Sequence, residues 1–255
     1  MNGSPPEHHL LGGLADQAYI QERISPKPGE TFYFHLSDLL LALKPHASDL
    51  KLRILDFGCG GSPYRSLFPN AEYFRADLGG VADVNFSIGD DGRTNAPADN
   101  FDVVLSTQVL EHCPSPDIYL EECRRVLRPG GRLILSTHGL FEEHGCPYDF
   151  QRWTEDGLKR LVEAHRLRVS SIKRVTSGPR AGLMLFQRSL VPVTEISAGP
   201  MTRLLWKFAR RLVLTRRPLW DPLFDHLFQS YRVSNDQRIP GDALYIALLA
   251  VAEAV

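Results

Sequence analysis

The stretch that decides the fold is Arg53 to Ser62, which reads RILDFGCGGS. An apolar run with Asp56 inside it leads into Gly58, Gly60 and Gly61. Because glycine has no Cβ, such a turn brings bare backbone N–H groups close to a ligand. In a doubly wound α/β sheet, nucleotide-like ligands bind at the carboxyl end of the first strand. The stretch therefore predicts a strand followed by a ligand-binding turn.

Length and composition are those of one α/β domain with an added cap. The chain has 255 residues, of which 43% are hydrophobic and 23% charged, as in ordinary globular proteins. Its net charge of −1 provides no general attraction to nucleic acid. The four cysteines lack metal-site spacing, which favours reduced thiols and a cytoplasmic protein. The sequence contains neither a secretory signal nor an apolar run of about 18 residues, so we expect no transmembrane segment.

From residue 51 onward, strand and helix patterns alternate, which is typical of a mostly parallel sheet. We therefore expect a Rossmann-like, doubly wound, seven-stranded α/β fold. The expected strands are Arg53 to Phe57, Glu72 to Ala76, Val84 to Phe86, Phe101 to Ser106, Leu133 to Thr137, Val169 to Val175 and Ala243 to Val251. Helices are expected between them, one beginning after Ser115 and ending at Pro129, another beginning after Thr154.

The rest of the chain divides into a leader, a helix and a cap. Residues 1–30 are expected to be largely flexible, and residues 31–255 to form one domain. Its core comprises residues 50–177 and 240–255, and residues 178–235 form a helical cap. The apolar stripe of Thr31 to Leu43 predicts a helix on the sheet edge or over the ligand cleft.

The glycine turn lacks the full dinucleotide pattern G-x-G-x-x-G, because Pro63 replaces the third glycine. This argues against a pyrophosphate ligand and a nicotinamide-dependent reductase. Asp77 follows Gly58 by 19 residues, close to the spacing of an acid that binds ribose hydroxyls. The ligand is therefore expected to carry a ribose.

Four segments in order resemble one family. LDFGCGGS is followed by ADL at 76–78, then by FDVVLSTQVLEH and RRVLRPGGRLILSTH. They resemble the successive motifs of class I S-adenosylmethionine-dependent methyltransferases, most closely the small-molecule branch, over about residues 50–175. The resemblance implies S-adenosylmethionine as cofactor.

The resemblance also implies roles for particular residues. The first turn would hold the amino-acid end of the cofactor, Asp77 its ribose, and Asp91 (or its neighbour Asp90) its adenine. The residues after the fourth strand would pass beside the methionine portion. The positions so matched are Asp56, Gly58, Cys59, Gly60, Asp77, Leu78, Asp91, Gly92, Ser106, Thr107 and Gln108. Asp56 and Asp91 are also explained as acids that close their own turns. The Glu111-His112 pair belongs to the same pattern.

Residues 138–154, HGLFEEHGCPYDFQRWT, are too polar and aromatic for a mere connector. A long loop at the carboxyl edge of the sheet is where substrate is expected. We hypothesise that His138 or His144, aided by Asp149, is the base that removes a proton from the methyl acceptor. A local ion pair between Asp149 and Arg152 is an equal alternative. We expect no metal site.

The expected function is methyl transfer to a hydroxyl or amine of a small molecule such as a sugar, glycan precursor or secondary metabolite. The alternatives are a catalytically silent methyltransferase fold that binds a partner, and a nicotinamide-dependent reductase. No nucleic-acid partner is expected. The basic amphipathic helix Met201 to Leu214 is expected to cover the active site or pack on the sheet, with contact to an anionic membrane as the alternative.

Overall fold

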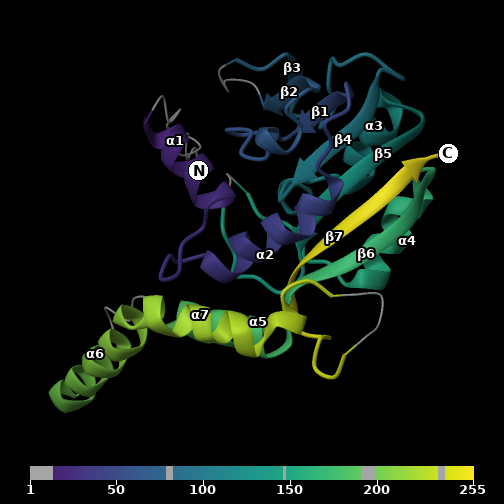
Figure 1. Cartoon of the computed structure of the whole chain (residues 1–255). Helices are drawn as coiled ribbons and strands as arrows, with labels where there is room; N and C mark the ends of the chain where they lie inside the picture. Colours follow the sequence, from purple (N-terminus) through teal and green to yellow (C-terminus); the bar gives the residue numbers. More distant parts are fainter. Residues whose placement is uncertain (1–13, 79–82, 146–147, 191–198, 235–238) are drawn as a thin grey trace, which may run out of the picture.

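The computed structural model describes residues 14–78, 83–145, 148–190, 199–234 and 239–255. Seven strands form one sheet in the order β3-β2-β1-β4-β5-β7-β6 (Figure 1). β7 runs antiparallel to β5 and β6, and the pairs from β3 to β5 are parallel. The predicted Rossmann-like fold is confirmed.

The strands agree with the predicted positions, with two informative differences. β3 begins two residues later than expected, because the Asn85 side chain accepts a bond from the Arg75 N–H where strand pairing would begin. β5 includes the Pro129-Gly130-Gly131 turn, and the register shift between Phe101 and Val103 accommodates it. The strands are β1 (Arg53–Phe57), β2 (Glu72–Leu78), β3 (Phe86–Ile88), β4 (Phe101–Thr107), β5 (Leu127–His138), β6 (Leu167–Ser177) and β7 (Tyr245–Ala254).

Helices cover both faces of the sheet (Figure 1). Thr154 caps its helix as predicted, since its hydroxyl accepts a bond from the Gly157 N–H, whereas Ser115 makes no side-chain capping bond. The helices are α1 (Leu14–Ile24), α2 (Tyr33–Leu43), α3 (Pro116–Val126), α4 (Glu155–Ala164), α5 (Gly178–Ser189), α6 (Pro200–Thr215) and α7 (Arg217–Leu227). Short 3-10 turns are η1 (Lys44–His46), η2 (Arg65–Leu67), η3 (Leu110–His112) and η4 (Gln229–Tyr231).

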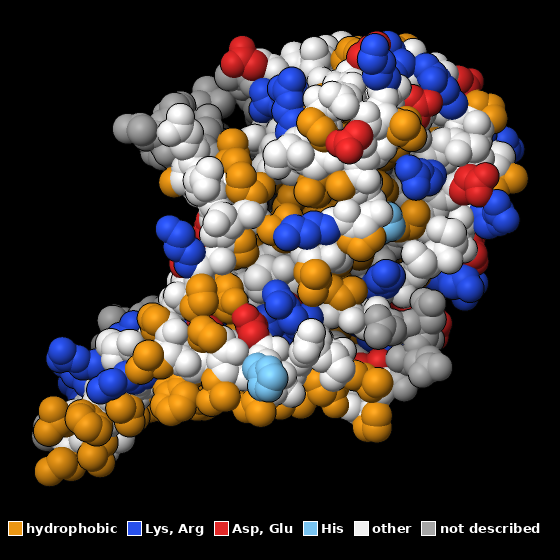
Figure 2. Space-filling model, in the orientation of Figure 1, with side chains coloured by type: hydrophobic (Ala, Val, Ile, Leu, Met, Phe, Trp, Pro, Cys, Tyr) orange, Lys and Arg blue, Asp and Glu red, His pale blue; other side chains and the backbone are white. Residues whose placement is uncertain are grey.

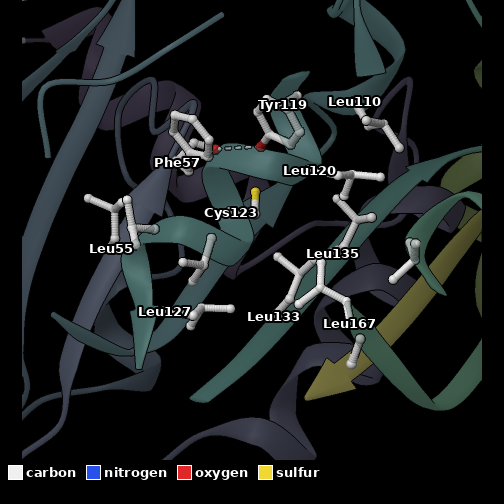
Figure 3. Close-up of a cluster of buried hydrophobic side chains, with 14 of the residues drawn as sticks. Leu55, Phe57, Leu110, Tyr119, Leu120, Cys123, Leu127, Leu133, Leu135 and Leu167 are labelled. Carbon is white, nitrogen blue, oxygen red and sulfur yellow. Dashed lines mark hydrogen bonds between the residues drawn. The ribbon is translucent and has the colours of Figure 1, made fainter. Parts of the chain in front are cut away.

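The alternation of side chains along β1 builds two cores. Leu55 and Phe57 pack on one face against residues of α3, including Leu120 (Figure 3). Ile54 points to the other face and packs with Leu39 of α2. Fully burying a side chain of this size contributes about 1.5–3 kcal/mol, so both faces of β1 hold the central strand in place.

Two predictions, one about the leader and one about the cap, were wrong. Part of the leader expected to be flexible is helical, because α1 packs beside α2. α6 neither packs on the sheet nor covers a cleft, because Met201 to Arg216 are all exposed or half-buried. α2 packs on a face of the sheet, as the cluster that it shares with Ile54 shows.

A buried ion cluster joins α2 to the cap. Asp38 of α2 accepts bonds from Arg180 Nε of α5 at 2.6 Å and from Arg232 Nε at 2.7 Å. It also accepts one from the Thr176 hydroxyl of β6 at 2.9 Å. Asp38 and Arg180 are fully buried, so each charge depends on the other for solvation.

Replacing Arg180 with methionine is expected to lower the free energy of unfolding by about 3–5 kcal/mol, because it leaves Asp38 buried with fewer partners. Chemical denaturation measures the loss. The control is Arg168→Met, which removes an exposed pair with Glu253, at a cost below about 1 kcal/mol. Equal losses in the two variants would contradict the structural role of the cluster.

Candidate active site

The glycine turn follows β1 at the carboxyl edge of the sheet and is held against both neighbouring strands. The N–H groups of Gly58 and Cys59 donate to the Ala76 carbonyl of β2 at 2.9 and 3.1 Å. Gly58 has a φ of +77°, and a Cβ there would lie 2.6 Å from both methyl groups of Val109. Only glycine fits this approach between the turn after β1 and the segment after β4.

Asp77 lies beside this turn at the end of β2. Its carboxylate accepts bonds from the N–H groups of Gly60 at 2.6 Å and Leu78 at 2.8 Å, and from the Cys59 thiol at 3.6 Å. Asp77 is half-buried, and a carboxylate offers about four acceptor positions, so it retains capacity for a ligand hydroxyl. The predicted contact of Asp77 with the ribose of S-adenosylmethionine stays a prediction.

Asp56 is enclosed beneath the turn. It is 3% exposed and accepts a hydrogen bond from the Tyr73 hydroxyl at 2.8 Å. Burial raises the pKa of Asp56 to about 7, although hydrogen bonds from Tyr73 and Ser62 oppose the shift. A cationic ligand in the turn would favour the ionised form and lower this pKa.

Asp91 and Gly92 lie in an exposed turn after β3. The Asp91 carboxylate accepts from the Arg93 N–H at 3.0 Å, and the Gly92 N–H donates to the Gly89 carbonyl at 2.9 Å. The predicted role of Asp91 as a turn-closing acid is confirmed. Its contact with adenine stays a prediction.

Ser106, Thr107 and Gln108, at the end of β4, differ in burial and in hydrogen bonding. Ser106 is fully buried, with its hydroxyl 2.6 Å from that of Tyr119. Thr107 is half-buried. Gln108 has a φ of +57° and donates to the Ser136 hydroxyl at 3.0 Å, while its buried Oε1 has no hydrogen-bond partner. Gln108 is therefore the residue of the three with a buried polar atom that no hydrogen bond satisfies.

A residue of the leader covers the glycine turn. A Cβ at Gly61 would lie 3.2 Å from the Tyr19 ring of α1, and one at Gly60 would lie 3.5 Å from its hydroxyl. The Arg23 guanidinium lies over the same ring at 3.5 Å from its centroid. Sequence reasoning missed Tyr19, because no local pattern connects it to the turn.

A second cluster lies where β4 and β5 end. Glu111 Oε1 is 3.2 Å from His138 Nε2, and Glu111 Oε2 accepts a bond from the Thr137 hydroxyl at 2.8 Å. Burial raises the pKa of Glu111 to about 7 and lowers that of His138 well below its usual value. His138 is therefore neutral at physiological pH, and its Nδ1 is buried without a partner. Sequence reasoning assigned Glu111 only to the family pattern and missed its contact with His138.

Aromatic rings enclose His138. Its ring stacks on that of Phe141 at 4.1 Å between centroids, and the rings of His35 and His144 lie 5.4 and 5.1 Å away. The loop after β5 therefore brings two of the predicted catalytic residues, His138 and His144, together.

Asp149 holds this loop in shape. Both of its oxygens accept bonds from Arg152 at 2.5 Å, and one accepts from the His144 N–H at 2.9 Å. The bonds from Arg152 lower the pKa of Asp149 to about 2, so it stays ionised. The predicted ion pair is confirmed. Asp149 also lies 3.3 Å from His144 Nδ1 and can orient that ring.

Glu111, His138 and His144 each offer one atom to a metal ion, and these atoms lie within 4.8 Å of one another. Glu111 Oε1 lies 3.2 Å from His138 Nε2 and has no hydrogen-bond partner. The absence of a metal therefore stays a prediction.

The contact at Gly58 is testable with a matched control. Gly130 has nearly the same φ, +76°, but nothing lies within 4 Å of a Cβ there. Both alanine variants are expected to lose about 1–2 kcal/mol from backbone strain. Gly58→Ala is expected to lose a further 1–3 kcal/mol or so from the collision with Val109, and to bind S-adenosylmethionine more weakly. Denaturation and calorimetry measure the two effects. Equal losses at the two glycines would refute the contact.

The raised pKa of Asp56 makes stability depend on pH. The folded state keeps this proton to about pH 7, whereas the unfolded chain loses it near its ordinary pKa of 3.8. Stability therefore falls as pH rises between these values, by up to about 4 kcal/mol. Asp56→Asn is expected to remove this part of the decline. Denaturation of both proteins from pH 4 to 7 measures it, and parallel curves would contradict the assignment.

Comparisons with known proteins match the central part of the chain. Residues 55–135 match the family described as methyltransferase domain. A ubiquinone biosynthesis O-methyltransferase of Cereibacter sphaeroides is 38% identical over 106 residues, which cover 34% of this chain and 41% of that protein. A malonyl-[acyl-carrier protein] O-methyltransferase of Methylococcus capsulatus is 30% identical over 120 residues, covering 41% and 44%. The chain spans less than half the length of these two relatives.

Solved structures share the fold. The [4+2]-cyclase SpnF has a TM-score of 0.52 and 17% identity, with 94% of each chain covered. A SAM-dependent methyltransferase from Archaeoglobus fulgidus has a TM-score of 0.50 and 14% identity, with 93% of this chain and 99% of that chain covered. Residues 55–135, which contain the glycine turn, therefore match a methyltransferase domain, and the chain shares the fold of a SAM-dependent methyltransferase.

Proposed function

We propose that this chain transfers a methyl group from S-adenosylmethionine to a hydroxyl group of a small molecule. Two relatives that it resembles are named as O-methyltransferases. The observation that carries the proposal is the buried pair of Glu111 and a neutral His138. Val109, which lies next to Gly58, precedes Glu111 by two residues. One short segment therefore connects the glycine turn to this pair.

The cofactor supplies an electrophilic methyl group, and the chain's own residues prepare the acceptor. His138 Nε2 faces Glu111 Oε1 at 3.2 Å, and the Nδ1 atom has no hydrogen-bond partner, so Nδ1 is the nitrogen that acts as base in this proposal. The acceptor hydroxyl loses its proton to Nδ1 as its oxygen gains the methyl group. The Glu111 carboxylate, with its pKa near 7, then stabilises the imidazolium.

The surrounding residues support an acceptor with apolar or aromatic character. Phe141 stacks on His138, and the Asp149–Arg152 pair holds the loop that carries His144. Tyr148 and Phe150 of the same loop are 59% and 48% exposed. Aromatic side chains that contact a bound acceptor exclude water from it and fix its orientation. A nucleic-acid acceptor is disfavoured by the net charge of −1.

The rival function is a methyltransferase fold without methyl transfer. The SpnF cyclase shares the fold over 94% of this chain, so the fold does not by itself determine the reaction. The reductase alternative is disfavoured, because residues 55–135 match a methyltransferase domain.

The test measures S-adenosylhomocysteine formed from S-adenosylmethionine with a panel of phenols, quinols and sugars. With an accepted hydroxyl compound, His138→Ala is expected to lower kcat by about 10²–10⁴-fold, the contribution of a general base, with little change in cofactor affinity. The rate is expected to fall as pH drops through about 7, because protonation of Glu111 removes the carboxylate that stabilises the imidazolium.

The matched control is His165→Ala, which removes a histidine at the end of α4 that contacts the Leu161 carbonyl and Asp117. It is expected to retain the wild-type rate. Full activity of His138→Ala would remove that residue from the chemistry. Binding of the cofactor without turnover of any acceptor would favour the silent fold.

A further inference from the structure

The arm formed by α6 and α7, Pro200–Leu227, carries an unusual amount of exposed apolar surface. Nine of the eighteen exposed large hydrophobic side chains among the described residues belong to these two helices. Figure 1 shows α6 extending away from the body, and Figure 2 shows hydrophobic side chains along the same edge and at the tip. A large exposed apolar patch usually marks a binding surface.

The pattern of α6 separates apolar from basic side chains. Met201, Leu204, Leu205, Phe208 and Leu212 recur at helical spacing on one face, and each is between 54% and 69% exposed. Arg203, Lys207 and Arg210 recur on another face, with Arg211 at its border. No acidic residue occurs between Gly199 and Trp220. The helix is therefore amphipathic and wholly basic in its charge.

α7 extends the apolar face and is anchored on its other side. Leu219, Leu223 and Leu227 share one face and are 63%, 44% and 58% exposed. The fully buried Asp221 accepts a bond from the Gly29 N–H at 2.8 Å, and Arg217 donates to the Glu30 carbonyl. These contacts hold the polar side of α7 against the body and leave its apolar side in solvent.

We propose that this arm binds an anionic lipid surface, with α6 lying in the plane of the membrane. An amphipathic helix with aromatic and leucine side chains on one face and Arg and Lys on another has the chemistry for that position. The basic stems extend toward lipid phosphates while the apolar face enters the acyl boundary. None of the described helices is long and apolar enough to cross a membrane.

A second copy of the chain is the other occupant to consider for this face. Two arms packed through their apolar faces would leave Arg203, Lys207, Arg210 and Arg211 of both copies without acids on α6 to pair with. Anionic lipid neutralises the same charges. The charge pattern therefore favours lipid, and the inference holds whether or not the proposed methyl transfer is correct.

Co-sedimentation of the full chain with vesicles tests the proposal. Vesicles of phosphatidylcholine with phosphatidylglycerol are expected to bind the protein at least about tenfold more tightly than phosphatidylcholine alone, with binding that weakens as salt rises. Leu204→Glu with Phe208→Glu, and separately Lys207→Glu with Arg211→Glu, are each expected to weaken binding by about tenfold or more.

The controls make the same chemical changes elsewhere on the surface. Leu50→Glu alters a side chain that is 67% exposed in the loop before β1, and Lys159→Glu with Arg160→Glu alters exposed charges on α4. These variants are expected to bind vesicles as the wild type does. Unchanged circular dichroism and cofactor binding establish that each variant is folded.

Three outcomes would overturn the proposal. The first is a wild-type protein that does not bind anionic vesicles at low salt. The second is unchanged vesicle binding by both arm variants. The third is a dimer in sedimentation velocity that Phe208→Glu dissociates, in a protein that does not bind vesicles, which would make the face an interface between copies.

Discussion

The contact between Gly58 and Val109 is the constraint on which the site depends. A Cβ at Gly58 would lie 2.6 Å from the Val109 methyl groups, so only glycine lets the turn after β1 approach the segment after β4 this closely. β1 and β4 are parallel neighbours, and their carboxyl ends therefore meet at one edge. This approach places the proposed cofactor turn beside the segment that carries Glu111.

Burial and pairing give the acids of this edge different properties. Asp56 and Glu111 lie in the interior, where desolvation raises the pKa of each to about 7. Asp149 is held by Arg152, which lowers its pKa to about 2. The first two acids cost stability when they ionise, whereas Asp149 stabilises its loop as a permanent anion. Residues of one chemical type thus serve the site in two distinct ways.

One part of the cap is anchored to the body by buried charges, and another part, α6, is exposed. Asp38, Arg180 and Arg232 form a buried charge cluster that joins α2 to α5 and to the segment after η4. α6, in contrast, has no buried side chain among Met201 to Arg216. The body therefore holds the arm at its α7 end, through Asp221 and Arg217, and leaves its apolar face accessible to another surface.

The sequence by itself determined the features that arise from local patterns. The residue bounds of β1, the cap at Thr154 and the glycine turn follow from side-chain alternation, a capping hydroxyl and the conformational freedom of glycine. Only the tertiary structure decided the Tyr19 cover, the pairing of Glu111 with His138, and the exposure of α6. These features join residues far apart in the chain or depend on what packs against a helix. A helical stripe shows that a face is apolar, but the packing of the whole fold decides whether that face is buried.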